Sequence, residues 1–485
     1  MRLLRLLIVL LFMVFLQTSA RGATPTLIQA VSCSNIQTNT VTDYKCNLPN
    51  TTLSGNALFV FATIDVASAA TITINDDQSN AYTVGLNFAG SNQRVWLGCT
   101  MATTGTRSFT VHFSTQTSSD FVQAAAAEFN NITNCTKDVS DSTGGGGLST
   151  TVTCGTGMTP TATNDLILHY MINQNPGPAT PITYTPGTSP WTILSADVQD
   201  GQVIQYQVDP NTSSITPTLT ASSSIGWDTV CVAYKSSTTG TAIPAGIRVV
   251  RMVHNAVTPG NSTTSVKVQL PGTSGNMLFI DNIDSPSSPD YKITLIADQD
   301  SHSFSEIGSP FQNADSGLCQ RWHSDNITFT SRTNIITLTM TSSGPAGGST
   351  FQVFEITGAA TSPFDVDSTA SGGASGNFTG GSVTPTTSNG LVFSQVANAG
   401  ATIIGGSPGN FLSNTLTPNP GTASVDQNNG WKVYPNPNTS TVTDSWTVSG
   451  TPGNWASTLT AFKAAPVGAS PIGVNKRAKL EKLDW

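Results

Sequence analysis

The chain has 485 residues, of which 10% are charged and 38% hydrophobic, and its formal net charge is −8. Nucleic-acid binding is not expected, because it requires a concentrated basic surface. The charged fraction is far below the ~25% of typical globular domains, so Ser, Thr, Asn, Gln and Gly must keep the protein soluble. Thr and Val favour strands, and Gly, Asn and Pro favour turns, so the composition predicts a β-rich protein.

The first 20 residues have the pattern of a secretory signal peptide. Arg2 and Arg5 precede an unbroken apolar run from Leu6 to Leu16, and Thr18 and Ala20 place small residues at a cleavage site. The run is shorter than the ~20 residues that span a bilayer. No later stretch is long and apolar enough to do so. We therefore expect a secreted protein, extracellular or at the cell surface, with no transmembrane segment after cleavage.

Short strand-like runs alternate with turn clusters along the rest of the chain. In the first half they cover residues 57–63, 70–74, 107–113, 121–129, 165–171 and 203–208. A spacing of ~8–12 residues, with Gly, Pro, Asn and Asp in between, is typical of sandwiches and barrels. A parallel α/β fold is excluded because no crossover helices are predicted.

An internal repeat divides the chain into two copies, from about residue 25 to 235 and from about 246 to 463. Both copies close on a strand that runs from Trp to an aromatic-Lys pair, Trp227 to Lys235 and Trp455 to Lys463. Earlier matches include Ser54-Gly-Asn-Ala-Leu-Phe-Val with Ser274-Gly-Asn-Met-Leu-Phe-Ile, and Thr159-Pro-Thr-Ala-Thr-Asn-Asp-Leu with Thr384-Pro-Thr-Thr-Ser-Asn-Gly-Leu. So many matches in one order establish a tandem duplication.

The repeat predicts an all-β chain with two tandem jelly-roll-like antiparallel β-sandwich domains after a signal peptide. The expected divisions are a signal peptide at 1–20, repeat 1 at 24–236, repeat 2 at 244–465 and a basic C-terminal tail at 466–485. The Ser/Thr/Gly-rich linker between the repeats should be short and moderately flexible. We interpret the basic tail as a solvated end.

Seven cysteines fit an oxidising compartment, and six of them lie in the first half. Cys33 and Cys46 flank a hairpin-like segment, so we expect them to pair. Cys135 and Cys154 flank a Gly-rich loop, and the same reasoning pairs them. Cys99 then remains for Cys231, although six cysteines allow 15 pairings. The seventh, Cys319, is interpreted as an inert buried thiol, because no activating context for it is visible.

Several motifs recur in both copies and suggest a resemblance. They are a Gly-Asn turn before an apolar strand, an acidic turn before an aromatic residue (Asp77 to Tyr82, Asp298 to Phe304), a Glu at a strand end and the final Trp strand. Through these motifs the chain resembles tandem β-sandwich modules of secreted proteins from environmental bacteria. The resemblance covers nearly the whole mature chain. The resemblance implies a bacterial exported protein with a lectin- or adhesin-type jelly-roll fold, and it implies no catalytic residue.

Two acid pairs are the only candidates for catalysis. Glu128 and Glu355 occupy equivalent places in the copies, as do Asp141 and Asp367. A glycan-active hydrolase on a jelly roll would need two such carboxylates. The commoner alternative is a strand-end Glu that accepts hydrogen bonds from loop N–H groups, together with a turn-forming Asp.

Acidic turns offer the only candidate metal ligands. Asp76, Asp77, Asp298 and Asp300 could supply oxygens to Ca²⁺, which exported sandwiches often bind. The alternative is that these residues form hairpin turns, as Asp commonly does. The five His residues show no zinc-binding spacing, and no other cofactor is predicted.

Tryptophans are the candidate sugar-binding residues. Trp431 and Trp446 have no Trp counterpart in the first copy, so we consider them for an exposed stacking platform. Trp227 and Trp455 recur at one repeat position, which favours a role in the core.

The leading hypothesis is a secreted, non-catalytic binding or adhesion protein that recognises extracellular polysaccharide or a cell-surface component. Two copies of a low-charge module can raise avidity without new contacts. The alternatives are a glycan-active hydrolase and a structural extracellular spacer or surface-layer component.

Overall fold

The computed structural model describes residues 23–466 except for 21 short gaps and single residues. The gaps are 39–42, 65–70, 91–92, 103–104, 115–119, 145–147, 175–181, 189, 199–200, 239, 242, 258–263, 271, 285–290, 314–316, 331–332, 343–348, 374–375, 399–401, 408–428 and 452. The predicted signal peptide and all but the first residue of the predicted tail lie outside the described residues. Strands are the regular elements of the described chain, so the all-β prediction is confirmed.

Eight strands form a first unit, which we call unit 1. They are β1 (Thr26–Thr38), β2 (Asp43–Asn47), β3 (Ala57–Ile64), β4 (Ile72–Asp76), β5 (Thr83–Ala89), β6 (Arg94–Met101), β7 (Ser108–Phe113) and β8 (Asp120–Asn130). A large antiparallel sheet has the order β1-β8-β3-β6-β5, and a small sheet has the order β2-β7-β4. The eighth strand therefore lies between the first and the third.

The next eight strands repeat this arrangement as unit 2. They are β9 (Ile132–Thr143), β10 (Ser149–Thr153), β11 (Asp165–Asn173), β12 (Tyr184–Pro186), β13 (Thr192–Asp197), β14 (Gln202–Asp209), β15 (Thr218–Ile225) and β16 (Trp227–Ser236). Their orders are β9-β16-β11-β14-β13 and β10-β15-β12. Strand for strand this is the topology of unit 1, so the first half of the chain is itself a pair of like units.

The second half contains two more such units. Unit 3 consists of β17 (Arg248–Val257), β18 (Thr264–Gln269), β19 (Met277–Asp284), β20 (Tyr291–Asp298), β21 (Ser305–Glu306), β22 (Cys319–Ser324), β23 (Ile335–Ser342) and β24 (Ser349–Thr357). Unit 4 consists of β25 (Ala359–Gly372), β26 (Phe378–Val383), β27 (Gly390–Asn398), β28 (Thr402–Ser407), β29 (Asn429–Asn436), β30 (Val442–Ser449) and β31 (Trp455–Ala464). Residues 408–428, between β28 and β29, lie outside the described residues, so no counterpart of the fifth strand is described in unit 4. The repeat found in the sequence is thus a repeat of unit pairs.

One turn marks the same position in all four units. It immediately precedes the third strand, and its key residue has a positive φ in every unit, which Gly and Asn adopt more readily than other residues. These residues are Gly55 (φ 80°), Asn164 (φ 64°), Gly275 (φ 87°) and Asn389 (φ 60°). The residue after each of them begins or adjoins the third strand.

The large sheets of units 1 and 2 pack face to face. Phe59 and Phe61 of β3 contact Tyr234 and Tyr170, with ring centroids 4.8 and 5.5 Å apart. The small sheets cover the outer faces of both large sheets. Each half of the chain is therefore a stack of four layers, small-large-large-small. In the second half, Phe279 of unit 3 contacts Phe393 and Phe462 of unit 4 across the matching interface.

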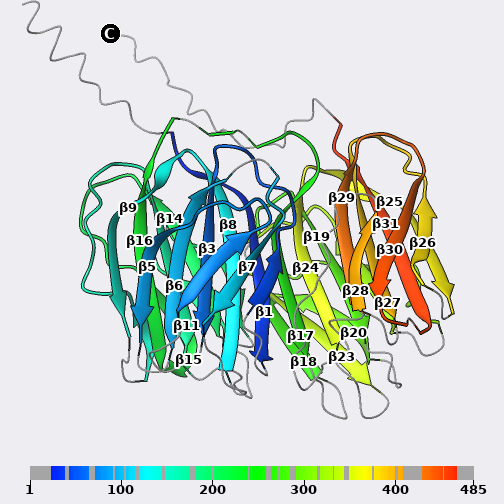
Figure 1. Ribbon diagram of the computed structural model, residues 1–485, viewed down its shortest axis with the longest axis horizontal. Coiled ribbons are helices and arrows are strands. Elements are labelled where there is room, and N and C mark those ends of the chain that lie inside the picture. The colour runs from blue at the N-terminus through cyan, green and yellow to red at the C-terminus, as the bar shows by residue number, and fades with distance from the viewer. Residues whose placement is uncertain are drawn as a thin grey trace, which may run out of the picture.

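The two halves join edge to edge. Strand β1 pairs with β17 in parallel, which creates a ten-stranded sheet, and β13 pairs with β18, which creates an eight-stranded sheet (Figure 1). In the ten-stranded sheet, the strand order outward from β17 repeats the strand order outward from β1, and β1 and β17 run in the same direction. The two halves are therefore related by an approximate two-fold axis along the strands. We call the β1–β17 junction the seam.

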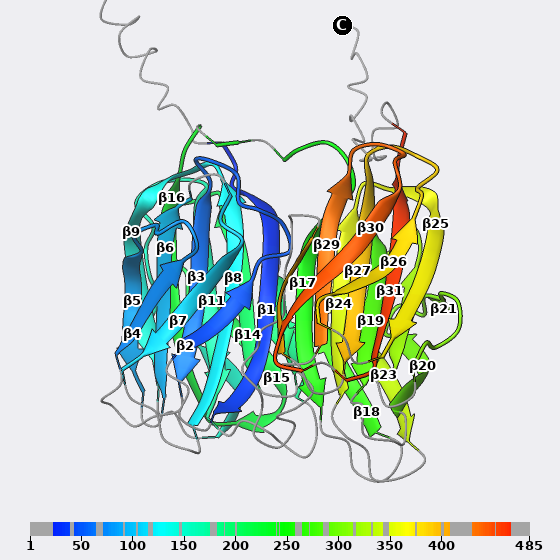
Figure 2. The same ribbon diagram turned by 45° about the vertical axis from the view of Figure 1, so that its right-hand side comes forward.

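Both ends of the described chain lie at one end of the strands. The N–H of Ala23 donates to Ser237 O, the N–H of Ser237 donates to Asn131 O, and the N–H of Ala465 donates to Gly358 O. These residues are also the links between units, so we call this the connection end. Figures 1 and 2 show the start of β1 and the end of β31 there, at the top. The opposite end, where β7 leads to Ser114 and Thr71 leads to β4, we call the distal end.

Candidate functional site

Glu128, a candidate acid from the sequence, lies fully buried near the end of β8. Its carboxylate accepts hydrogen bonds from Leu53 N at 2.9 Å, Asn56 Nδ2 at 2.7 Å and Gln29 Nε2 at 2.7 Å. The side chain is 0% exposed. Burial raises the pKa of Glu128, and the three hydrogen bonds act against that rise. This carboxylate holds the turn before β3 in place, as the structural alternative predicts.

Glu355 occupies the equivalent position on β24 and is also 0% exposed. It accepts hydrogen bonds from Thr273 N and Asn276 Nδ2, each at 2.6 Å. Its third partner differs from that of Glu128, because Arg251 stands where unit 1 has Gln29. The Arg251 guanidinium donates to Glu355 at 2.5 Å and is itself buried. Unit 3 thus carries a buried ion pair at a position where unit 1 carries a neutral contact.

The seam brings the two glutamates toward a common cation. Arg248 donates to Ile28 O at 2.5 Å across the seam. Burial lowers the pKa of Arg248, while the negative charges of Glu128 and Glu355 both act to raise it. The pair is therefore part of a buried polar junction between the halves. Neither glutamate reaches solvent, where a substrate would have to bind.

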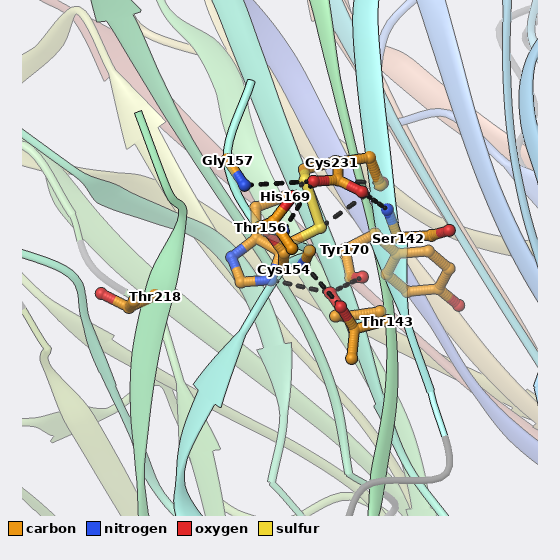
Figure 3. Close-up of a disulfide and its surroundings, with 12 residues drawn as sticks. Ser142, Thr143, Cys154, Thr156, Gly157, His169, Tyr170, Thr218 and Cys231 are labelled. Atoms are coloured by element: carbon orange, nitrogen blue, oxygen red, sulfur yellow. Dashed lines mark hydrogen bonds between the residues drawn. A yellow bond between two sulfur atoms is a disulfide. The ribbon is translucent and has the colours of Figure 1, made fainter. Parts of the chain in front are cut away.

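Asp141 lies next to a disulfide and stabilises a turn. Its Oδ2 accepts the N–H groups of Thr156 at 2.8 Å and Gly157 at 3.1 Å, and its Oδ1 accepts the N–H of Ser142 at 2.8 Å. Figure 3 shows these groups gathered around the bond between Cys154 and Cys231. Among the described residues, no hydrogen bond joins Asp141 to Glu128 and no residue bonds both, so the structure does not assemble them into an acid pair.

Asp367 has a different role, at the contact between units 3 and 4. Its Oδ2 lies 3.3 Å from the guanidinium of Arg321, which is 2% exposed and also donates to Thr460 Oγ1 at 2.7 Å. In the described part of the chain, Asp367 makes no hydrogen bond to Glu355. The second acid pair is therefore not assembled either.

The candidate calcium ligands all form turns. Asp76 accepts the N–H groups of Gln78 and Asn80, and Asp77 accepts the N–H of Arg107. In unit 3, Asp298 accepts the N–H of His302 and also bonds its ring, while Asp300 bonds Thr330. Within the described residues no three His, Cys, Asp or Glu side chains are grouped to hold a metal ion. These carboxylates are occupied by N–H and O–H donors.

Three disulfides connect the six cysteines of the first half, and two of the expected pairings are wrong. Cys33 pairs with Cys46 as predicted. Cys99 pairs with Cys135, however, and Cys154 pairs with Cys231. The reason is the layering. Cys33–Cys46 and Cys154–Cys231 each join the two sheets of one unit, and Cys99–Cys135 joins unit 1 to unit 2.

The seventh cysteine, Cys319, is free and buried, as predicted. Its Sγ lies 3.8 Å from Ala456 O in unit 4. Burial raises the pKa of the Cys319 thiol to about 12, so the reactive thiolate is disfavoured. His323, its neighbour in sequence, bonds Asp325 instead.

We expect Cys319 to resist a thiol reagent in the folded protein. Because burial blocks access and disfavours the thiolate, labelling should reach about one thiol per chain only after denaturation without reductant. Mass spectrometry of the labelled chain measures this. Rapid labelling of Cys319 under native conditions would contradict the burial.

The tryptophans mostly lie in the core. Trp227 and Trp455 are each 6% exposed, which confirms their predicted core role. Trp446 is 1% exposed, and its indole N–H donates to Asp444, so the prediction of an exposed stacking platform at Trp446 is wrong. It packs with Val396 and Trp455 because the face of β30 that carries Trp446 lies against the sheet of β27 and β31. Trp431 is on β29, but its side chain lies outside the described residues.

Two polar clusters in unit 2 have little or no signature in the sequence. His169 is fully buried, with Nε2 2.7 Å from Thr229 Oγ1 and Nδ1 2.7 Å from Gln205 Nε2 (Figure 3). Burial lowers the pKa of His169 to about 3, so the ring is neutral. The second cluster contains Asp138 and Asp165. Its only sequence signal is that Asp165 follows the unit 2 turn at a position where units 1 and 3 have Asn.

No helical segment in the described part of the chain has the length and hydropathy needed to span a bilayer. The fold and its buried polar groups are those of an all-β protein with three disulfides in its first half. A scan against protein-family models and a search of the curated proteins both return no match.

Proposed function

We propose that this chain is a secreted, non-catalytic binding protein that presents its distal end to an extracellular polysaccharide or a cell-surface component. The proposal includes export through the signal peptide predicted at residues 1–20. Disulfides are typical of exported proteins, and the three of the first half support this part of it.

The placement of the chain ends carries the proposal. Ala23 and Ala465, near the two ends of the described chain, both bond to links between units at the connection end. A spacer that adds length needs its two ends at opposite poles. A chain held by either end at the connection end instead leaves the whole distal end of four units facing outward.

The buried acids favour binding over hydrolysis. Glu128 and Glu355 are 0% exposed and already hydrogen-bonded within the fold. A general acid or nucleophile must lie within hydrogen-bond reach of its substrate. Four like units on one block also offer repeated surfaces in a fixed arrangement, and repetition raises avidity for a repeating ligand such as a polysaccharide.

Attachment of the chain from either end tests the proposal. Biotin placed on Thr238→Cys holds the chain by the connection end, and biotin on Ser114→Cys holds it by the distal end. Each immobilised protein is probed with a broad panel of soluble polysaccharides and with whole cells. We expect retention on the first support and a loss of tenfold or more on the second.

Two outcomes would count against it. No retention of any polysaccharide or cell on the Thr238→Cys support would exclude the binding function for that panel. Equal retention in both orientations would show that the ligand does not use the distal end. Far-ultraviolet circular dichroism of both variants controls for folding.

A further inference from the structure

Three strands of unit 2 bring two carboxyl groups and one ammonium group together. Asp138 on β9 accepts hydrogen bonds from Thr161 N and Thr161 Oγ1, each at 2.6 Å. The ammonium of Lys235 on β16 lies 3.2 Å from Asp138 Oδ1. The Asp138 side chain is 4% exposed, whereas that of Lys235 is half exposed. Asp138 is thus a carboxylate with a full set of donors.

Asp165 at the start of β11 is the unusual member of this cluster. It is 0% exposed, and although the N–H of Ala162 lies near its carboxyl, neither buried carboxyl oxygen makes a hydrogen bond of normal geometry to a donor. Lys137 on β9 and Leu166 on β11 both lie opposite Tyr234 of β16, so the neighbouring Asp138 and Asp165 flank the same stretch of β16, and their carboxyl groups interact. Two carboxyl groups can form such a bond only if one of them carries a proton.

The equivalent positions in the other units show what this site lacks. The residue after the turn is Asn56 in unit 1 and Asn276 in unit 3, and each donates its amide N–H to the buried glutamate. In unit 4 it is Gly390, while Asp365 binds Thr386 as Asp138 binds Thr161. Unit 2 alone places an acceptor where the others place a donor or no side chain.

We infer that Asp138 and Asp165 share one proton at neutral pH, which makes unit 2 a pH-sensitive element that is most stable in mild acid. The charges that face the pair are few. Lys235 on β16 compensates one negative charge of the pair, whereas Asp209, opposite Asp165 on β14, accepts the N–H of Asn211 instead. One bound proton neutralises the remaining negative charge, for which a second cation would otherwise be needed.

The electrostatics agree with this geometry. Burial first, and then the neighbouring Asp138, raises the pKa of Asp165 to about 7, whereas Lys235 acts in the opposite direction. Burial disfavours the charged form of Asp138, but its bonds from Thr161 and Lys235 lower its pKa below the ordinary value. The two carboxyl groups therefore titrate apart, as expected for a pair that shares a proton.

The sign of the pH effect follows from these directions. Asp165 binds its proton more tightly in the folded protein than in the unfolded chain. Its contribution to the stability of the fold is therefore complete below its unfolded pKa of about 3.9 and is lost as pH rises through about 7. Asp138 behaves in the opposite way, and its contribution is lost as pH falls below about 3.9. Unit 2 should therefore be most stable near about pH 4 to 5.

Asp165→Asn tests the inference with the residue that units 1 and 3 already use. The readout is hydrogen exchange of the full chain over residues 165–173 and 227–236, corrected for the intrinsic effect of pH. From about pH 4.5 to about pH 8, protection in the native protein should fall by a factor on the order of 10² relative to Asp165→Asn. Asp209→Asn is the matched control and should keep the native pH dependence.

Lys235→Met provides a second, independent measurement. Removing the ammonium takes away the charge that favours the ionised pair, so the pH at which protection falls should move upward. The inference is overturned if the native protein and Asp165→Asn show the same pH dependence. It is equally overturned if Asp209→Asn abolishes the effect as fully as Asp165→Asn, or if Lys235→Met leaves the midpoint unchanged.

Discussion

Replacing Glu355 by Ala is expected to lower the free energy of unfolding by about 3–5 kcal/mol. The substitution leaves the guanidinium of Arg251 buried without its carboxylate, and it removes the acceptor of Thr273 N and Asn276 Nδ2. Breaking a buried ion pair by removing one partner costs this much because the remaining charge is no longer compensated. Denaturant unfolding with disulfides intact measures the loss.

Glu128→Ala is the natural matched control. The site has the same turn, the same Asn and the same burial, but its third partner is the neutral Gln29. The expected loss is about 1–3 kcal/mol, because the hydrogen-bond donors left unsatisfied are neutral and the nearby Arg248 keeps the charge of Glu355. The double variant Arg251→Gln with Glu355→Gln should recover part of the loss of Glu355→Ala. Equal losses for the two Ala variants would show that Arg251 and Glu355 do not interact as a charged pair.

Removing the Cys154–Cys231 bond is expected to lower the free energy of unfolding by about 4 kcal/mol, more than removal of either other disulfide. Its residues are 77 positions apart, against 36 for Cys99–Cys135 and 13 for Cys33–Cys46. In the chain-entropy description, a longer closed loop restricts the unfolded chain more. The paired Ala variants, studied by denaturant unfolding without reductant, should therefore follow the order of loop length.

A separate experiment checks the connectivity of the disulfides. Peptide mapping of the native chain without reductant should recover Cys99 joined to Cys135, and Cys154 joined to Cys231. Recovery of Cys135 joined to Cys154 would contradict the layering described above. Cys319→Ser is the control, because it removes a buried thiol that takes part in no bond and should leave the map unchanged.

The predictions that succeeded rest on local patterns. The strand that closes each copy, β16 or β31, is visible because alternation and β-branched residues act within a few positions. Cys33 and Cys46 are only 13 residues apart, so their pairing follows from neighbouring strands. The repeat was likewise found from residue identities alone.

The predictions that failed depended on which faces of the strands pack against one another in the folded chain. Trp446 looked exposed because it has no counterpart in the first copy, yet its strand directs it under β27 and β31. Cys154 is close to Cys135 in sequence, but it follows a strand of the small sheet whose inner face covers Cys231. The likeness between units 1 and 2 also escaped notice, because it lies in strand order and turn geometry more than in residue identity.

Composition, short-range alternation and repetition are properties of the chain alone, and they are enough to predict an all-β, duplicated chain with six of its seven cysteines in the first half. The remaining features depend on the tertiary structure. It divided each copy into two like units, paired the cysteines across layers and enclosed Glu128 and Glu355 at the seam. The physical reason is that burial and partnership arise between strands far apart in sequence. The same carboxylate can thus be a solvent-facing acid or a buried turn anchor until its neighbours are known.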